Sequence, residues 1–218
     1  MDLNVFLQHF DYLMRDIDGI KKIRRLIINL AVSGLLDCSS KDGWVTKKLG
    51  QLVTFEYGKS LPEKSRISGE FPVYGSNGIV GSHCMAIVHQ PAIVIGRKGS
   101  AGALNISNKP FWPTDVTYYS VPPDFLDIHF YFYILSTLNL DKLGKGIKPG
   151  LNRNDAYEIQ ISYPPIEVQA KIVSKINKLL ALCEQLEKQL IYSQRIHSHL
   201  MDSIVFSIKN VNVDNIHE

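Results

Sequence analysis

The clearest pattern in the chain is a repeat of apolar positions in its C-terminal third. Pro164 and Pro165 end any preceding helix, so a new helix is expected from about Ile166. Apolar side chains then recur at alternating steps of four and three residues, a heptad seam that buries a narrow stripe along another helix. The seam positions are Ile172, Ile176, Leu179, Cys183, Leu186 and Leu190.

The seam continues more weakly through His197, Leu200 and Ile204. A helix from Ile166 to Leu200 would be about 50 Å long. This stretch contains neither Gly nor Pro, and a helix of that length predicts a partner helix and a coiled coil. The alternative is a plain core helix that covers its own domain.

Residues 1–36 have a helical pattern with an expected break at Gly19 and an end at Gly34. The first apolar face comprises Leu3, Phe6, Leu7 and Phe10, and the second comprises Ile20, Ile23, Ile27, Leu30 and Ala31. The other side of the second helix is basic, with Lys21, Lys22, Arg24 and Arg25. This basic side is either a solvated face or a phosphate contact. A polar linker follows at 37–43 and predicts a domain boundary.

The middle of the chain alternates between short apolar segments and turn residues. Segments rich in β-branched and aromatic residues predict strands at 49–55, 71–74, 86–88, 92–95, 116–121 and 159–162. A helix is expected at 125–138, where Ile128, Phe132 and Leu135 have helical spacing. The predicted fold is therefore α+β, with a mixed sheet flanked by N-terminal helices and one long C-terminal helix.

This pattern predicts four segments. They are an N-terminal helical segment with its linker (1–43), a globular domain (44–163), a long helix (164–210) and a tail (211–218).

Composition narrows the class of protein. The chain has 218 residues, of which 45% are hydrophobic and 21% charged, and its net charge is only +3. These values are typical of a globular protein, so any nucleic-acid binding would depend on local placement of charge. Cys38, Cys84 and Cys183 lie far apart, which predicts neither a zinc site nor a disulfide framework and suits a reducing cytoplasm. No signal peptide or membrane span is expected.

Three glycine-rich stretches carry the unusual local chemistry. They are Tyr74–Gly81, Gly96–Gly102 and Gly144–Asn154, and all mix Gly with Lys, Arg, Asn or Ser. Glycine lets a backbone approach a charged surface closely, and the polar side chains can bind phosphates or base edges. Any one stretch alone is equally well a tight turn, but three in one domain favour a binding surface. None has the spacing of a nucleotide phosphate loop.

Enzyme signatures are missing from the sequence. No glutamate is followed two residues later by a lysine, as a nuclease motif requires, and Tyr163-Pro-Pro-Ile166 shares only its prolines with the amino-methyltransferase motif. His83, His89 and His129 are scattered, so no metal ligand or catalytic residue is predicted. The segment from Trp44 to Tyr163 contains twelve Lys and Arg residues and nine Asp and Glu residues, which gives it a net charge of +3.

Taken together, these residues resemble one half of the specificity (S) subunit of type I restriction-modification systems. Tyr163-Pro-Pro-Ile-Glu-Val-Gln-Ala-Lys-Ile-Val173 and Leu179-Leu-Ala-Leu-Cys-Glu-Gln-Leu-Glu187 are similar to the family's Pro-Pro-Leu-x-Glu-Gln-x-x-Ile-Val and Leu-Met-x-Leu-Cys-Asp-x-Leu-Glu. Val168-Gln169 stands where the family has Glu-Gln. Other similar segments are Ala31–Gly34, Trp44 with Lys48–Gly50, Phe71–Gly78, Ile95–Gly102 and Trp112–Asp115.

The resemblance implies a non-catalytic protein that recognises half of a split double-stranded DNA site through a target recognition domain at 44–163. It also implies methyltransferase and restriction subunits as partners, with S-adenosylmethionine bound by the methyltransferase and no cofactor in this chain. The chain would be a half-subunit that forms a homodimer through the heptad seam, or the N-terminal part of a longer chain. The candidate DNA contacts are Asn77, Arg97, Lys98, Lys145, Lys148, Asn152 and Arg153.

Two rival functions remain at this point. One is an adaptor that dimerises and binds a protein partner without reading DNA, in which case the glycine-rich stretches are turns. The other, a self-sufficient nuclease or methyltransferase, is disfavoured by the missing motifs. A salt-dependent affinity for DNA would count against the adaptor.

Overall fold

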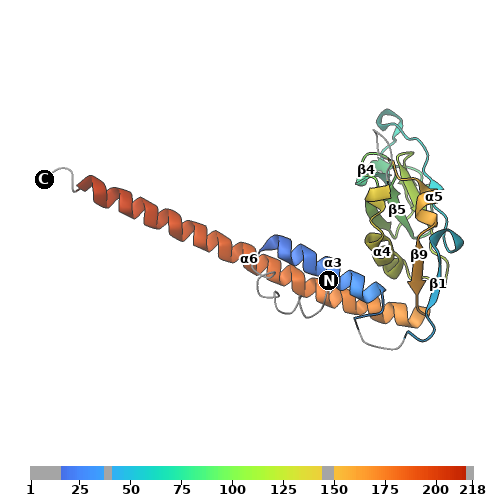
Figure 1. Ribbon diagram of the computed structural model, residues 1–218. Coiled ribbons are helices and arrows are strands. Elements are labelled where there is room, and N and C mark those ends of the chain that lie inside the picture. Colours follow the sequence, from blue (N-terminus) through green and yellow to red (C-terminus); the bar gives the residue numbers. More distant parts are fainter. Residues whose placement is uncertain (1–15, 37–40, 144–149, 215–218) are drawn as a thin grey trace. The chain divides into compact units, whose positions relative to one another are not determined.

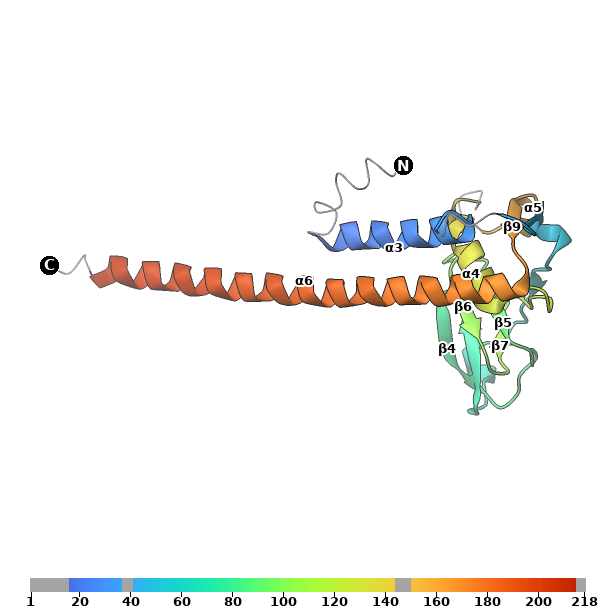
Figure 2. The same ribbon diagram turned by 90° about the horizontal axis from the view of Figure 1, so that it is seen from below.

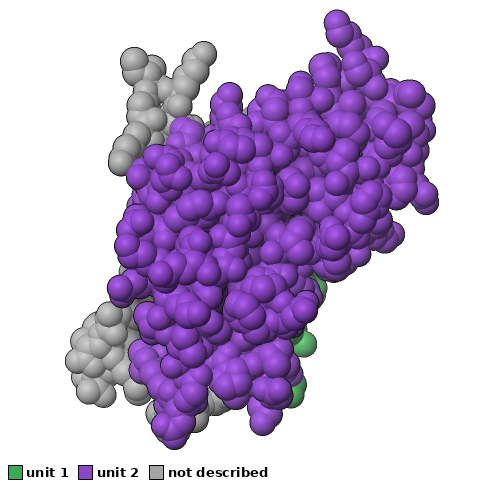
Figure 3. All heavy atoms as spheres, turned by 90° about the vertical axis from the view of Figure 1, so that its right-hand side faces the viewer, with its two compact units in different colours: residues 1–27, 176–218 green, residues 28–175 purple. Residues whose placement is uncertain are grey.

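The computed structural model describes residues 16–36, 41–143 and 150–214, with side chains up to residue 205. The chain divides into two compact units, which Figure 3 distinguishes by colour. One unit comprises residues 1–27 and 176–218, and its described part is helical. The other comprises residues 28–175 and contains the described strands.

The larger sheet of the second unit has four antiparallel strands among the described residues, in the order β2-β8-β5-β6. These strands are β2 (Glu56–Tyr57), β5 (Ala92–Gly96), β6 (Leu104–Ser107) and β8 (Thr117–Ser120). Every residue of β5 is buried, as expected for the continuous apolar run Ala-Ile-Val-Ile-Gly. The strands predicted at 92–95 and 116–121 are confirmed.

A second sheet of three strands makes the architecture mixed. Within the described chain its order is β4-β3-β7, where β3 (Phe71–Gly75) pairs antiparallel with β4 (Gly78–His83) and parallel with β7 (Trp112–Pro113). The register shifts between Val73 and Tyr74. A separate antiparallel pair joins β1 (Val45–Lys48) to β9 (Gln160–Tyr163).

Helices and short 3-10 turns complete this unit. Helix α4 (Ile128–Thr137) begins where the Asp127 side chain accepts hydrogen bonds from His129 N–H and Phe130 N–H. It lies against β5 and β6, below the sheet in Figure 1. The other elements are η1 (Leu49–Gln51), η2 (Glu63–Ser65), η3 (Leu140–Leu143) and α5 (Arg153–Tyr157).

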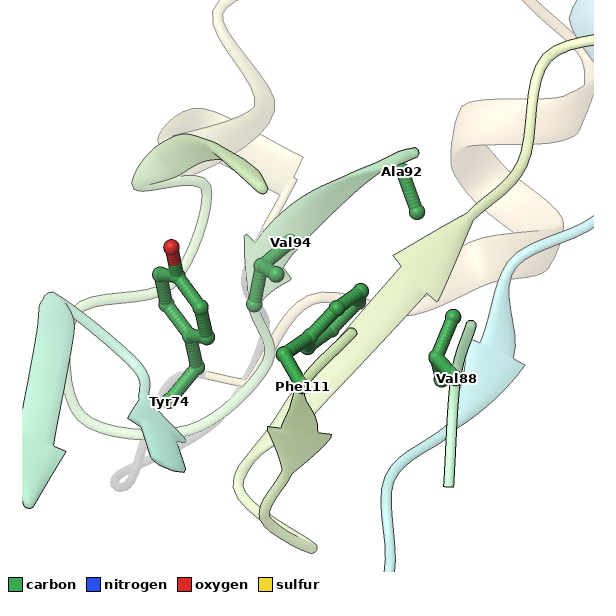
Figure 4. Packing of buried hydrophobic residues seen from close by; sticks show 5 residues of the cluster. All are labelled: Tyr74, Val88, Ala92, Val94 and Phe111. Carbon is green, nitrogen blue, oxygen red and sulfur yellow. The ribbon is translucent and has the colours of Figure 1, made fainter. Parts of the chain in front are cut away.

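Part of the core lies between the two sheets (Figure 4). Phe111 and Val88, which form an isolated bridge with each other, pack with Tyr74 of β3 and with Ala92 and Val94 of β5. The Phe111 ring meets the Tyr74 ring edge-to-face, with 5.4 Å between their centroids. This cluster joins β3, which leads into one glycine-rich turn, to β5, which leads into another.

The helical unit pairs α3 (Ile17–Val32) with part of α6 (Ile166–Asp214), as Figures 1 and 2 show. Ile20 and Ile23 of α3 pack against Cys183 of α6, and Ile27 and Leu190 extend the contact. Arg24 and Glu187 form an ion pair at 2.6 Å beside this contact. The α+β fold with its long C-terminal helix is therefore confirmed.

The long helix differs from its prediction in two ways. It has 49 residues, which corresponds to about 74 Å, and it runs beyond the expected boundary at residue 210. The seam was expected to pack against a second copy of the chain, but at Cys183 and Leu190 it is covered by α3 of the same chain. Leu186 is exposed and Leu179 is half-buried, so the cover is incomplete.

The N-terminal helix starts earlier than its glycine indicated. Gly19 does not break it, because the helix begins at Ile17 and Gly19 N–H donates to the Asp16 carboxylate at 2.5 Å. Gly34 does end it, with φ +70° and a hydrogen bond from Leu35 N–H to Leu30 O at 2.8 Å. The face expected at Leu3, Phe6, Leu7 and Phe10 lies outside the described residues.

Two predicted strands are wrong. Residues 49–55 begin with η1, where Leu52 N–H and Val53 N–H both donate to Leu49 O, so the apolar residues pack from a turn. Residues 86–88 contribute only the bridge between Val88 and Phe111. Conversely, β4, β6 and β7 were not predicted, because glycine, asparagine and proline mask their strand pattern.

Candidate nucleic-acid interface

The first two glycine-rich stretches form turns at strand ends. Tyr74–Gly81 contains the β3–β4 hairpin, whose turn residues are Ser76 and Asn77, and Gly78 has φ +121°. Gly96–Gly102 connects β5 to β6. Of the third stretch, residues 144–149 lie outside the described part and residues 150–154 lead into α5.

Close backbone approach brings these two turns together. A side chain added at Gly96 would lie 2.6 Å from the Ser76 carbonyl oxygen and would also collide with the Ser100 carbonyl. At Gly99, which has φ +77°, the added atom would lie 3.4 Å from Ser76 Oγ. The absence of a side chain at Gly96 is therefore what allows the β5–β6 turn to lie on the β3–β4 turn.

Backbone hydrogen bonds add the third stretch to the same place. Leu151 N–H donates to Arg97 O at 2.9 Å, and Lys98 forms an isolated bridge with Gly150. On the other side, Arg97 N–H and Lys98 N–H donate to Val116 O at 2.9 and 3.1 Å. All three glycine-rich stretches thus meet around Arg97.

Two arginines lie over one tyrosine ring at this meeting point. The guanidinium carbons of Arg97 and Arg153 are 4.9 and 4.8 Å from the centroid of the Tyr57 ring, and Arg97 is 5.8 Å from that of Tyr118. These are cation–π distances. We call Tyr57, Arg97, Tyr118 and Arg153 the arginine–tyrosine cluster.

Helix α5 fixes the backbone beside the cluster. Tyr157 accepts a hydrogen bond from Phe55 N–H at 2.6 Å, and Arg153 Nη1 donates to Phe55 O at 3.0 Å. Both peptide groups of Phe55 are therefore bound by α5, which places β2 and Tyr57 under Arg153.

Charge in the cluster is not neutralised within the described chain. No carboxylate among the described residues forms an ion pair with Arg97 or Arg153, although both side chains are half-buried. Burial raises the pKa of Tyr118 to about 12, helped by its hydrogen bond with Tyr57, while the two arginines lower it. Tyr118 is therefore neutral at physiological pH, and its hydroxyl donates to Leu151 O at 3.2 Å. The cluster is a positive site with aromatic walls.

The structure brings together three of the candidate residues, Arg97, Lys98 and Arg153. Lys98 is exposed, and Asn77 is exposed beside Ser76. The Asn152 side chain caps α5 by accepting from Asn154 N–H at 3.1 Å, which gives it a structural role. Lys145 and Lys148 lie outside the described residues.

The sequence analysis missed both tyrosines of the cluster, Tyr57 and Tyr118. Tyr57 is 48% exposed and lies on β2, a strand of two residues that is too short for an alternation pattern. The available signal was an aromatic residue between Glu56 and Gly58, close to a basic residue, Lys59. The proximity of Tyr57 to Arg97 and Arg153 arises from pairing between segments that are distant in sequence.

The described residues lack two other features, a metal-binding cluster and a membrane-spanning helix. Those residues contain no group of three or more His, Cys, Asp or Glu side chains that could hold a metal ion. Among the described helices, none is long and apolar enough to cross a membrane.

Solved structures share this fold. The S subunit of a type I restriction-modification system from M. genitalium has 22% sequence identity and a TM-score of 0.64, over 91% of this chain and 57% of its own. The HsdS subunit from Thermoanaerobacter tengcongensis has 16% identity and a TM-score of 0.60, over 91% of this chain and 56% of its own. A structure from work on complex assembly and conformational transition of the type I R-M system has 16% identity and a TM-score of 0.64, over 94% and 58%.

The chain spans less than three fifths of the length of these structures. No curated protein matches its sequence. The family described as "Type I restriction modification DNA specificity domain" matches residues 41–193. Fold and sequence thus agree on a DNA specificity domain, and the chain belongs to this type I restriction-modification family.

Proposed function

We propose that this chain recognises one half of a bipartite DNA site as the specificity subunit, or half-subunit, of a type I restriction-modification complex. The observation that carries the proposal is the arginine–tyrosine cluster, where three glycine-rich stretches expose positive charge without a carboxylate partner in the described chain. Arginine, lysine and backbone groups of this kind bind DNA phosphates and base edges.

The proposed role is recognition without catalysis. In this proposal a partner methyltransferase binds S-adenosylmethionine and methylates the DNA, and a restriction subunit cleaves it. Membership of the specificity family and the missing catalytic motifs both support this division of labour.

Replacing Arg97 with alanine is expected to weaken DNA binding by about 1–3 kcal/mol if the guanidinium makes a bidentate contact. The measurement is the affinity for a DNA duplex that contains the recognised site, over a range of salt concentrations. A suitable control is Lys109→Ala, which removes one charge from an exposed lysine beyond the opposite end of β6.

For unchanged protein the affinity should fall steeply as salt rises, because phosphate binding releases counterions. Equal affinities for the Arg97 and Lys109 variants, with both folded, would remove Arg97 from the interface. An affinity that is absent or independent of salt would instead favour the adaptor function.

The proposal includes a homodimer formed through α6. Ile172, Ile176 and Cys183 of the predicted seam are buried within this chain, so a second copy would contact the remaining apolar side chains. The exposed apolar side chains along α6 include Leu182, Leu186, Ile191, Ile196, Leu200 and Ile204. The same helix would also bind methyltransferase subunits.

A methylation map of DNA from cells that co-express this chain with its methyltransferase tests the dimer. Two identical copies related by a twofold axis place two recognition domains in opposite orientation, so a split palindromic motif is expected. An asymmetric split motif would instead mean that a second, different recognition domain takes part. No methylation from a soluble, associated complex would leave the adaptor function standing.

A further inference from the structure

The two arginines of the cluster differ in what they bind. Arg153 already donates one N–H to Phe55 O at 3.0 Å. The Arg97 side chain has no hydrogen-bond acceptor among the described residues and is held only by the Tyr57 and Tyr118 rings. Within the described part of the chain, the donors of its planar guanidinium fork are therefore unused.

The backbone of Arg97 is fixed from both sides. Its N–H donates to Val116 O and its carbonyl accepts from Leu151 N–H, both at 2.9 Å. Together with the ring contacts, this restricts the positions that the guanidinium can take. A phosphate contact does not require a side chain held in one position, because a flexible lysine binds phosphate as a point charge. A bidentate contact to a base edge requires a fixed plane, and Arg is suited to such contacts.

The charge near Arg97 also favours a base-edge contact over a phosphate contact. Asp115 is exposed and immediately precedes Val116, whose carbonyl oxygen binds the Arg97 and Lys98 N–H groups. A carboxylate in this turn opposes the approach of a phosphate. Lys98 is exposed and lies next to Arg97 in the chain, so it is the better phosphate contact.

We infer that Arg97 is a specificity-determining residue that reads guanine, donating to its O6 and N7 in the major groove, with Tyr57 as the residue that positions it. This inference rests on the proposed DNA recognition and adds the base that is read. The half-site recognised by this domain therefore contains at least one required G·C pair.

Arg97→Gln tests the inference by methylation mapping of the co-expressed complex. Glutamine pairs with adenine rather than guanine, so methylation at sites with a changed base at one G·C position should rise about tenfold relative to the original site. The other positions of the motif should keep their preference. The matched control, Lys98→Gln, removes the neighbouring charge and should lower methylation at all sites equally.

Tyr57→Leu tests the positioning role. Loss of the ring should relax the same G·C position, while Tyr57→Phe, which keeps the ring, should retain the motif. A uniform loss with an unchanged motif would mean that the ring only supports the fold, and would overturn its positioning role.

Three results would overturn the guanine reading. They are a motif of the unchanged chain without any required G·C pair, an unchanged motif with uniformly weaker methylation in Arg97→Gln, and equal behaviour of the Arg97 and Lys98 variants. Each of these keeps a DNA motif, so the proposed function would survive it. The absence of any motif from unchanged chain would overturn both.

Discussion

Gln169→Glu is expected to destabilise the second unit by about 2–4 kcal/mol at neutral pH, because it places a carboxylate against two carbonyl oxygens. Gln169 is 0% exposed and lies in the first turns of α6. Its Nε2 donates to Phe125 O at 2.9 Å and to Pro164 O at 2.8 Å, and its Oε1 accepts from Asp127 N–H at 2.8 Å. The single amide thus connects α6 to the segment that begins α4.

The effect should depend on pH with a definite sign. Burial beside carbonyl oxygens favours the neutral form of the introduced carboxyl, so its pKa in the folded protein lies above that in the unfolded chain. The folded variant then binds more protons, and its free energy of unfolding falls as pH rises. The difference from the unchanged protein should accordingly be smaller at pH 5 than at pH 8.

Denaturant unfolding at the two pH values measures this difference. Gln189→Glu is the matched control, because Gln189 is exposed on the same helix and the identical exchange there should have little effect. Equal stabilities for the two variants would contradict the role given to the Gln169 amide.

Phe111→Ala is expected to lower the free energy of unfolding by about 3–5 kcal/mol, because it leaves a cavity between the two sheets. Phe111 is 0% exposed and contacts the rings of Tyr74 and Tyr119 edge-to-face, at centroid distances of 5.4 and 6.3 Å. The cluster in Figure 4 shows its ring between Val94 and Val88. Thermal or denaturant unfolding measures the loss.

Phe125→Ala provides the comparison for this substitution. Phe125 is 46% exposed and stacks on Tyr163 at 5.7 Å, so the loss there should be about 1 kcal/mol. Phe111→Leu retains most of the volume and should cost less than Phe111→Ala. A small loss for Phe111→Ala would mean that the two sheets do not depend on this cluster.

The parts of the fold that were predictable share a strong local pattern. The continuous apolar run of β5 and the long uninterrupted pattern of α6 each require only one segment of sequence. By contrast, β7 contains a proline and pairs with β3, nearly forty residues earlier in the chain. No local sequence pattern therefore predicts this strand. The cover of the seam by α3 was missed for the same reason, because it joins opposite ends of the chain.

The candidate site was predictable in its loops but not in its arrangement. Arg97, Lys98 and Arg153 were indicated by stretches that combine glycine with basic residues. Such a composition favours close backbone approach and hydrogen bonds to DNA, and it is visible in the sequence alone. Tyr57 was missed, since its importance arises from the ring positions of two arginines that are distant in sequence. Asn152 shows a different ambiguity, because a polar residue before a short helix can serve as its cap, and composition alone does not separate this role from a binding role.

The part of α6 beyond Leu190 has a thermodynamic consequence for any partner. Its described side chains, up to Val205, are all exposed, so residues 191–205 depend on helix propensity rather than on burial against other described residues. When a partner covers this segment, part of the interaction free energy offsets the cost of ordering the helix, and only the remainder contributes to affinity. Assembly and helix ordering then form one coupled equilibrium, and amide protons in this segment should become protected from exchange only when the partner binds.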